Sequence, residues 1–162
     1  MVILGIDPGI GRMGWGIIEA QNGKLKSQNF GCLETDSKET IETRLLVVYK
    51  FVDSLIKKYK PDALATEELF FNTNAKTAFV VGQARGVIIL AGSKNNIPIF
   101  SYTPLQVKIA ITGYGRAEKQ QIGQMVKVIL NLFEIPKIDD TCDALAVAIA
   151  HANSAKMAKF EK

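Results

Sequence analysis

The first part of the chain alternates short apolar runs with glycine-rich or polar breaks, a pattern typical of strands joined by tight turns. Residues 2–7 (VILGID) are predicted to form a buried strand, and residues 13–20 (MGWGIIEA) its hairpin partner. Residues 24–35 (KLKSQNFGCLET) are predicted to form a third strand. The pattern therefore predicts an antiparallel meander of three strands.

The apolar spacing then changes to steps of three and four residues, the period of an amphipathic helix. It predicts a helix over residues 40–59, which ends before Pro61, and a second helix over residues 74–96. Two short strands, residues 63–68 and 97–102, flank the second helix. A strand, a helix and a strand in succession form a crossover unit, which makes the two strands parallel.

The remaining segments have helical spacing, at residues 104–111, 117–133 and 139–152. The complete order predicts an α/β protein with a ribonuclease-H-like fold, in which helices flank a five-stranded mixed sheet. A length of 162 residues fits one domain. We expect that domain at residues 1–155, with a flexible C-terminal tail at residues 156–162.

Composition is ordinary for a globular protein, with 48% hydrophobic and 22% charged residues. The longest apolar runs, such as residues 87–91, are too short to cross a bilayer. Asp7 and the nearby glycines interrupt any secretion signal at the start, so we expect a cytoplasmic protein with no membrane contact. The net charge of +4 permits an anionic partner without requiring one.

Metal-binding thiols and disulfides are not indicated. Cys32 and Cys142 are far apart in sequence, and His151 is the single histidine. A zinc centre therefore lacks ligands, and a disulfide framework lacks members. Cys142 is expected to be a buried, small apolar residue.

Acidic residues end two of the predicted strands. Asp7 ends the first strand, and Glu67 follows the apolar strand Ala63, Leu64, Ala65. Functional groups gather beyond the carboxyl ends of parallel strands. Alone, Asp7 is equally consistent with a turn, because Asp-Pro-Gly favours one. Side chains alternate along a strand, so at most one of Glu67 and its neighbour Glu68 belongs to the site.

Two further acids begin the last helix. Asp140 and Asp143 are three residues apart and share one face of its first turn, although Asp139 or Asp140 could serve only as the helix cap. Asp143 precedes a nearly all-apolar run, and a carboxylate on a buried helix needs a partner. With Asp7 and Glu67 they form an all-oxygen set suited to Mg²⁺ or Mn²⁺.

Six motifs occur in an order and spacing that resembles the RuvC family of Holliday-junction resolvases. They are GIDPG, ATEELFF, GQARG, QVK, AEK and DxxDALAxA, and together they cover nearly the whole chain. The resemblance implies a homodimeric endonuclease that cuts two opposing strands of a four-way DNA junction by symmetric incisions, in homologous recombination and DNA repair. It also implies the RuvA and RuvB branch-migration proteins as partners.

The resemblance assigns roles to individual residues. It implies two Mg²⁺ ions per subunit, with Mn²⁺ able to substitute, and it places their ligands at Asp7, Glu67, Asp140 and Asp143. Lys108 and Lys119 match lysines that lie near the scissile phosphate. Without the resemblance these two lysines would be interpreted as solvated surface residues. An ammonium group near the reacting phosphate would offset charge that the metal ions leave uncovered.

Aromatic and basic residues supply the expected DNA contacts. Phe70 matches the family's base-contacting phenylalanine, and Phe71 would then be a core residue, or the two roles could be exchanged. An exposed aromatic ring can stack on bases or wedge between them. Lys76 and Arg116 are predicted phosphate contacts. Arg12 lies in a variable part of the family's hairpin and is considered as a further DNA contact.

Several glycines suggest close approaches of the backbone. Gly82 and Gly86 lie four residues apart near Phe79, and a glycine costs about 1 kcal/mol inside a helix. The resemblance places the dimer interface on this helix, whereas packing against its own sheet is the alternative. Gly9 suits a tight hairpin. We expect Gly14 and Gly16 where the second strand passes close to the metal ions or DNA.

Three other functions compete with junction resolution. The first is a ribonuclease-H-like nuclease of different specificity. The second is an actin-like or sugar-kinase-like ATPase, which shares the early sheet order but needs two lobes, whereas 162 residues supply one. The third is a non-catalytic junction-binding module, against which the presence of all four acids argues.

Overall fold

The computed structural model describes residues 1–68 and 75–160. These residues form one five-stranded sheet of order β3-β2-β1-β4-β5. The central strand β1 pairs antiparallel with β2 and parallel with β4. The elements in chain order are β1 (Val2–Asp7), β2 (Arg12–Gln21), β3 (Lys24–Glu34), α1 (Ile41–Tyr59), β4 (Ala63–Glu67), α2 (Ala75–Lys94), β5 (Ile99–Tyr102), α3 (Pro104–Thr112), α4 (Lys119–Leu130) and α5 (Asp139–Phe160).

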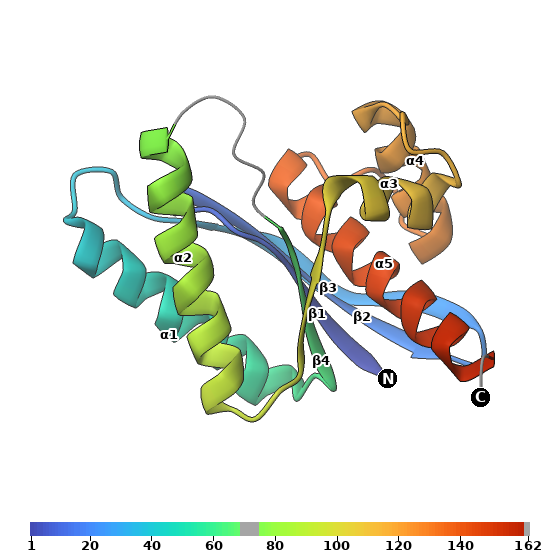
Figure 1. Cartoon of the computed structure of the whole chain (residues 1–162), viewed down its shortest axis with the longest axis horizontal. Coiled ribbons are helices and arrows are strands. Elements are labelled where there is room, and N and C mark those ends of the chain that lie inside the picture. Colours follow the sequence, from blue (N-terminus) through green and yellow to red (C-terminus); the bar gives the residue numbers. More distant parts are fainter. Residues whose placement is uncertain (69–74, 161–162) are drawn as a thin grey trace.

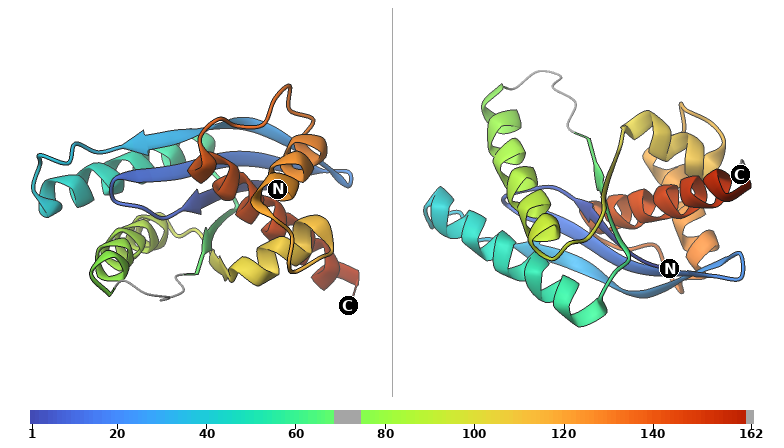
Figure 2. Two further views of the ribbon diagram at one scale, coloured as in Figure 1. Left: turned by 90° about the horizontal axis from the view of Figure 1, so that it is seen from above. Right: turned by 60° about the horizontal axis from the view of Figure 1, so that its bottom comes forward.

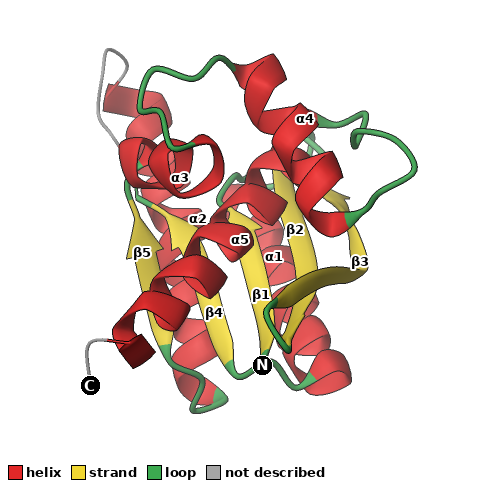
Figure 3. Ribbon diagram, turned by 90° about the vertical axis from the view of Figure 1, so that its right-hand side faces the viewer, coloured by secondary structure: helices red, strands yellow, loops and turns green. Residues whose placement is uncertain are grey.

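Helices cover both faces of the sheet. Figures 1 and 2 show α1 and α2 on one face and α5 on the other, and α3 and α4 lie beside α5. Figure 3 shows α5 crossing in front of the strands. The described residues therefore form three layers, with the mixed sheet between two layers of helices. This arrangement confirms the predicted fold.

The alternation of side chains along β1 divides the core in two. Ile3 belongs to the cluster under α5, whereas Leu4 and Ile6 belong to the cluster under α1 and α2. In β4, Ala65 faces α5 and Leu64 faces the other side. This period of two decides which face each strand-terminal acid takes.

Glycines let α5 lie unusually close to β1 and β2. A Cβ atom on Gly5 would overlap the carbonyl oxygen of Ala144, and one on Gly14 would overlap the backbone of Asp140. At Gly16 it would lie 2.5 Å from a methyl group of Leu145. The prediction that Gly14 and Gly16 make room for metal ions or DNA was therefore wrong, because the packing of α5 requires them.

The hairpin glycine behaves as expected. A Cβ atom on Gly9 would overlap the carbonyl oxygen of Arg12, so the tight turn between β1 and β2 leaves no room for a side chain. The hydroxyl of Thr35, just after β3, donates to the carbonyl of Ile10 and ties this hairpin to the end of the third strand. The turn that follows Asp7 is therefore fixed from two sides.

The last helix extends further than the sequence predicted. It continues to Phe160, so residues 153–160 are helical, whereas the flexibility expected of residues 156–162 stays a prediction. Two polar side chains in this stretch hydrogen-bond within the fold: the Ser154 hydroxyl donates to the Ala150 carbonyl, and the Asn153 amide donates to the Ala110 carbonyl. Polarity without glycine or proline does not end a helix. The domain limits themselves stay a prediction.

Candidate active site

The two strand-terminal acids lie side by side on the α5 face of the sheet. Asp7 shares its side of β1 with Ile3, and Glu67 shares its side of β4 with Ala65. The parallel register pairs Ile6 with Thr66. Asp7 and Glu67 are the next residues of these two adjacent strands, so they lie at the same level of the sheet. Glu68 lies beyond the end of β4 and is exposed.

The first turn of α5 supplies the other two acids. Asp7 is paired across the sheet with Gly14, and the missing side chain of Gly14 lets the backbone of Asp140 lie directly on β2. Asp143 follows one turn later on the same helix. The partial positive charge of the helix N-terminus favours carboxylates at these positions.

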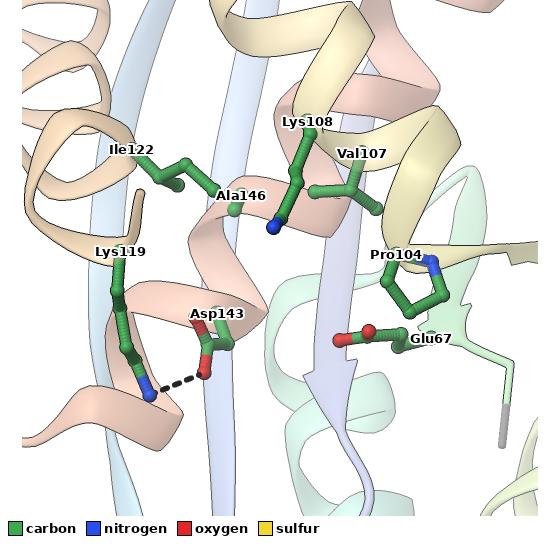
Figure 4. Close-up of a pocket in the computed structure, with 8 residues that line it drawn as sticks. All are labelled: Glu67, Pro104, Val107, Lys108, Lys119, Ile122, Asp143 and Ala146. Atoms are coloured by element: carbon green, nitrogen blue, oxygen red, sulfur yellow. Dashed lines mark ion pairs between the residues drawn. The ribbon is translucent and has the colours of Figure 1, made fainter. Parts of the chain in front are cut away.

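A pocket of about 220 Å³ opens between the end of β4 and the three C-terminal helices. Its charged lining comes from Glu67, Asp143, Lys108 and Lys119, as Figure 4 shows. Its other lining residues are Pro104, Val107, Ile122 and Ala146. Two predicted acids and both predicted lysines therefore share one pocket.

The pKa values of Asp7, Glu67 and Asp143 are all raised, in part by neighbouring acids. Burial, followed by the charges of Asp143, Glu67 and Asp140, raises the pKa of Asp7 from 3.8 to about 8. Burial and the charge of Asp143 also raise the pKa of Glu67, and burial raises that of Asp143. The charge of Lys119 acts in the opposite direction on all three. The protein alone thus opposes full ionisation of the cluster.

Two basic side chains contact the cluster. Lys119 Nζ lies 3.3 Å from Asp143 Oδ2 and 3.2 Å from Asp139 Oδ2. Arg12 Nε lies 3.4 Å from Asp140 Oδ2. Partial burial lowers the pKa of Lys119, but the charge of Asp143 and the contacts with both aspartates outweigh this effect and raise it.

Asp140 keeps a buried oxygen that accepts no hydrogen bond from any residue in the described ranges. The nearby Arg12 is within ion-pair distance of this oxygen but lacks hydrogen-bond geometry. A buried carboxylate oxygen without a partner is costly unless a cation binds it. Arg12 supplies such a cation to Asp140 as an ion pair, without completing a hydrogen bond.

The donor set fits a hard divalent cation. All four candidate ligands are carboxylates, which Mg²⁺ and Mn²⁺ prefer. Across residues 1–68 and 75–160, no three acidic, histidine or cysteine side chains lie close enough together to hold one ion as they stand.

The remaining residues singled out from the sequence fall into two groups, those that the structure describes and those that it does not. Phe70 and Phe71 lie outside the described residues, and Lys76 falls in the first turn of α2. Arg116 is exposed in the loop between α3 and α4. His151 is buried away from the acids, where it hydrogen-bonds with the Tyr102 hydroxyl at 2.7 Å.

Cys142 is buried, as the sequence predicted. Burial raises the pKa of its thiol to about 11, so the thiol stays protonated. It therefore acts as a small apolar group beneath the acid cluster rather than as a ligand.

The outer face of α2 carries two of the three residues predicted at a dimer interface, Phe79 and Gly86, together with Leu90. Phe79 is 68% exposed and Leu90 is 58% exposed. Gly86 is exposed between them, and a Cβ atom there would meet nothing within 4 Å, whereas Gly82 is half-buried. Packing against its own sheet therefore does not explain Gly86.

Asp139 is the residue that sequence reasoning missed. It was considered only as a helix cap, yet its side chain pairs with Lys119. The one signal in the sequence was its position beside Asp140, which carries no information about a lysine twenty residues earlier. Only the packing of α4 against α5 brings the two together.

Comparison with known proteins identifies the family. Residues 3–151 match the sequence profile described as "Crossover junction endodeoxyribonuclease RuvC". The chain belongs to the RuvC family. It is 54% identical over 154 residues to the RuvC of Alkaliphilus metalliredigens, a match that covers 95% of this chain and 94% of that protein.

Solved RuvC structures agree over nearly the full length. Thermus thermophilus RuvC superimposes with a TM-score of 0.90 at 35% identity, covering 98% of this chain and 97% of that one. The same protein in complex with Holliday junction substrate also gives 0.90, at 32% identity, with 97% and 96% covered. Membership confirms the ribonuclease-H-like fold and identifies the chain as a metal-dependent nuclease rather than an ATPase.

No helix within the described ranges is both long enough and apolar enough to span a bilayer.

Proposed function

We propose that this chain resolves four-way DNA junctions as a homodimer, by hydrolysing a phosphodiester bond in each of two opposing strands. The observation that carries the proposal is the meeting of acids from β1, β4 and α5 with two lysines from α3 and α4. Such a site binds a phosphate through its cations and through metal ions held by its acids. No histidine or serine nucleophile is required.

The proposed metal ligands are Asp7, Glu67, Asp140 and Asp143, which would hold two Mg²⁺ ions per subunit, with Mn²⁺ able to substitute. When bound, such ions lower the pKa of an attacking water and stabilise the leaving oxygen. Asp7 lies at the centre of the charge coupling, because the other three acids all act on its pKa. Asp7 is therefore proposed as the central carboxylate of the set that would hold the ions.

Lys108 and Lys119 are proposed to contact the scissile phosphate. Both point into the pocket that Glu67 and Asp143 line, as Figure 4 shows. An ammonium group there offsets negative charge that builds up at phosphorus in the transition state. Pro104 begins α3 within the capping box of Thr103, and this fixes the helix that carries Lys108.

DNA contacts further from the metal ions are proposed at Phe70, Lys76 and Arg116. Phe70 follows Glu67 closely in sequence, so its ring would reach a base next to the cleaved bond. Arg116 is exposed three residues before Lys119, where a neighbouring phosphate could bind. Arg12 already pairs with Asp140 and would be released to DNA when that acid binds a cation.

A magnesium-dependent nicking assay tests the proposal. Glu67→Gln should abolish cleavage of a synthetic four-way junction and leave junction binding intact, because it removes a ligand and no phosphate contact. The matched control is Glu68→Gln, which changes the exposed neighbour and should retain cleavage. Equal loss in both variants would contradict the metal assignment. Equal cutting of linear duplex and junction would indicate a general nuclease instead.

The homodimer is proposed to form through α2. Its exposed Phe79 and Leu90, with Gly86 between them, give an apolar stripe on one helix face. Phe79→Glu should convert the dimer to a monomer in analytical ultracentrifugation, whereas Val128→Glu, at an equally exposed position on α4, should not. A dimer that survives Phe79→Glu would place the interface elsewhere.

Membership in the family supports a proposal about the cellular setting. We propose a cytoplasmic enzyme of homologous recombination and DNA repair that receives its junctions from the RuvA and RuvB branch-migration proteins. Co-purification of a tagged chain with those proteins on junction DNA would test the partnership.

A further inference from the structure

Asp139 stands beside the four proposed ligands without belonging to them. It is the first residue of α5, its side chain is 74% exposed, and its Oδ2 lies 3.2 Å from Lys119 Nζ. Lys119 is the first residue of α4. The pair therefore joins the N-terminal ends of two helices at the edge of the pocket.

The backbones of these two helix ends are fixed. Gly123, one turn after Lys119, has no side chain where α4 meets its neighbours: a Cβ atom there would lie 3.2 Å from Ile135 and 3.8 Å from Cys142 Sγ. Val126 is buried in the cluster that includes Cys142. The flexible part of this region is thus the four-carbon side chain of Lys119 itself.

The ammonium group of Lys119 needs an external partner. It belongs to the first turn of a helix, where the partial positive charge repels a cation, and no acid lies in the first turn of α4. Among the residues that the structure describes, its acceptors are Asp143 and Asp139. Asp143 is a proposed metal ligand, so a metal ion would compete with Lys119 for its oxygens. Asp139 is not among the proposed ligands.

We propose that Asp139 is a positioning residue for Lys119. It keeps the ammonium group at the mouth of the pocket, where the scissile phosphate enters, once Asp143 has turned to a metal ion. This inference rests on the proposed role of Lys119 in cleavage. The effect belongs to the rate rather than to folding, because an exposed ion pair contributes little to stability.

Single-turnover cleavage of a four-way junction, with enzyme in excess and saturating Mg²⁺, tests the proposal. Asp139→Ala should lower the cleavage rate constant about threefold to fivefold and leave the enzyme concentration for half-maximal binding unchanged. Asp139→Glu, which keeps the charge, should restore most of the rate. The matched control is Glu42→Gln, which removes a first-turn acid from α1 on the opposite face of the sheet and should leave the rate unchanged.

A double-mutant cycle with Lys119→Met separates positioning from a structural effect. If Asp139 acts through Lys119, Asp139→Ala will not slow the Lys119→Met enzyme further. The same threefold to fivefold loss in both backgrounds would overturn the proposal. A slow Lys119→Met with a fully active Asp139→Ala would overturn this inference alone, whereas a fully active Lys119→Met would refute the proposed role of Lys119 as well.

Discussion

Asp7→Asn should make the protein more stable in the presence of a chelator while it abolishes cleavage. Burial and three neighbouring acids raise the pKa of Asp7 from 3.8 to about 8. The folded protein therefore holds a proton that the unfolded chain releases at neutral pH. Keeping that proton costs folding free energy, and an asparagine at the same position has no proton to hold.

The magnitude follows from the pKa difference. A pH of 7 is about three units above the ordinary pKa of the Asp7 carboxyl, which applies in the unfolded chain. Each unit corresponds to about 1.36 kcal/mol, so the upper limit of the gain in stability is about 4 kcal/mol. Asp7 is only partly buried, and a buried amide has its own cost, so about half of this gain is expected. The loss of folding stability that Asp7 causes in the wild-type protein should grow from about pH 4 to about pH 8 and then level off. The reason is that the pKa of Asp7 is higher in the folded protein than in the unfolded chain.

Urea unfolding in EDTA at several pH values between 5 and 8 measures the effect. The stability of the wild-type protein should fall with rising pH more steeply than that of Asp7→Asn, by up to about 1.4 kcal/mol per pH unit. Glu68→Gln, at the exposed neighbour of Glu67, serves as the control and should follow the wild type. Parallel curves for wild type and Asp7→Asn, or equal stability at pH 7, would refute the reasoning.

Two further predictions concern the elements that hold the site. Gly14→Ala should destabilise the protein by about 1–3 kcal/mol in urea unfolding, because the new Cβ overlaps the backbone of Asp140. The control is Gly11→Ala in the same hairpin, whose Cβ would make only an ordinary contact and which should leave the stability unchanged. Thr103→Ala removes the side-chain cap of α3 and should cost about 1 kcal/mol by the same measurement; an unchanged midpoint would show that Pro104 alone sets the start of that helix.

Local patterns predicted the parts of the site that depend on one element or on sheet geometry. Asp7 and Glu67 were predicted as neighbours because each follows an apolar strand, and the strand period of two then places both on the α5 face. Asp140 and Asp143 were predicted to share a face because helical residues three apart do so. These rules need no knowledge of the tertiary packing.

Features that depend on how separate elements pack were not predictable in this way. Gly14 was assigned to metal or DNA, but its reason is the distance between β2 and α5, which no local pattern encodes. The pairing of Lys119 with Asp139 depends in the same manner on the packing of α4 against α5. The extent of α5 beyond Ala152 was missed because its polar side chains find partners in α3 and in the preceding turn of α5.

Helix α5 supplies two proposed ligands and also most of the buried apolar side chains on its face of the sheet. This combination explains how the acid cluster can exist. Residues 144–150 of α5 are all buried, and Gly5 and Gly14 let the helix lie directly on β1 and β2. Mutual repulsion of the carboxylates favours moving α5 away from the sheet, which would uncover this core. Burial of the apolar run opposes that movement, so the acids lower their repulsion by protonation, ion pairing with Lys119, or cation binding. The cluster therefore favours a cation because the packing of α5 prevents the acids from moving apart.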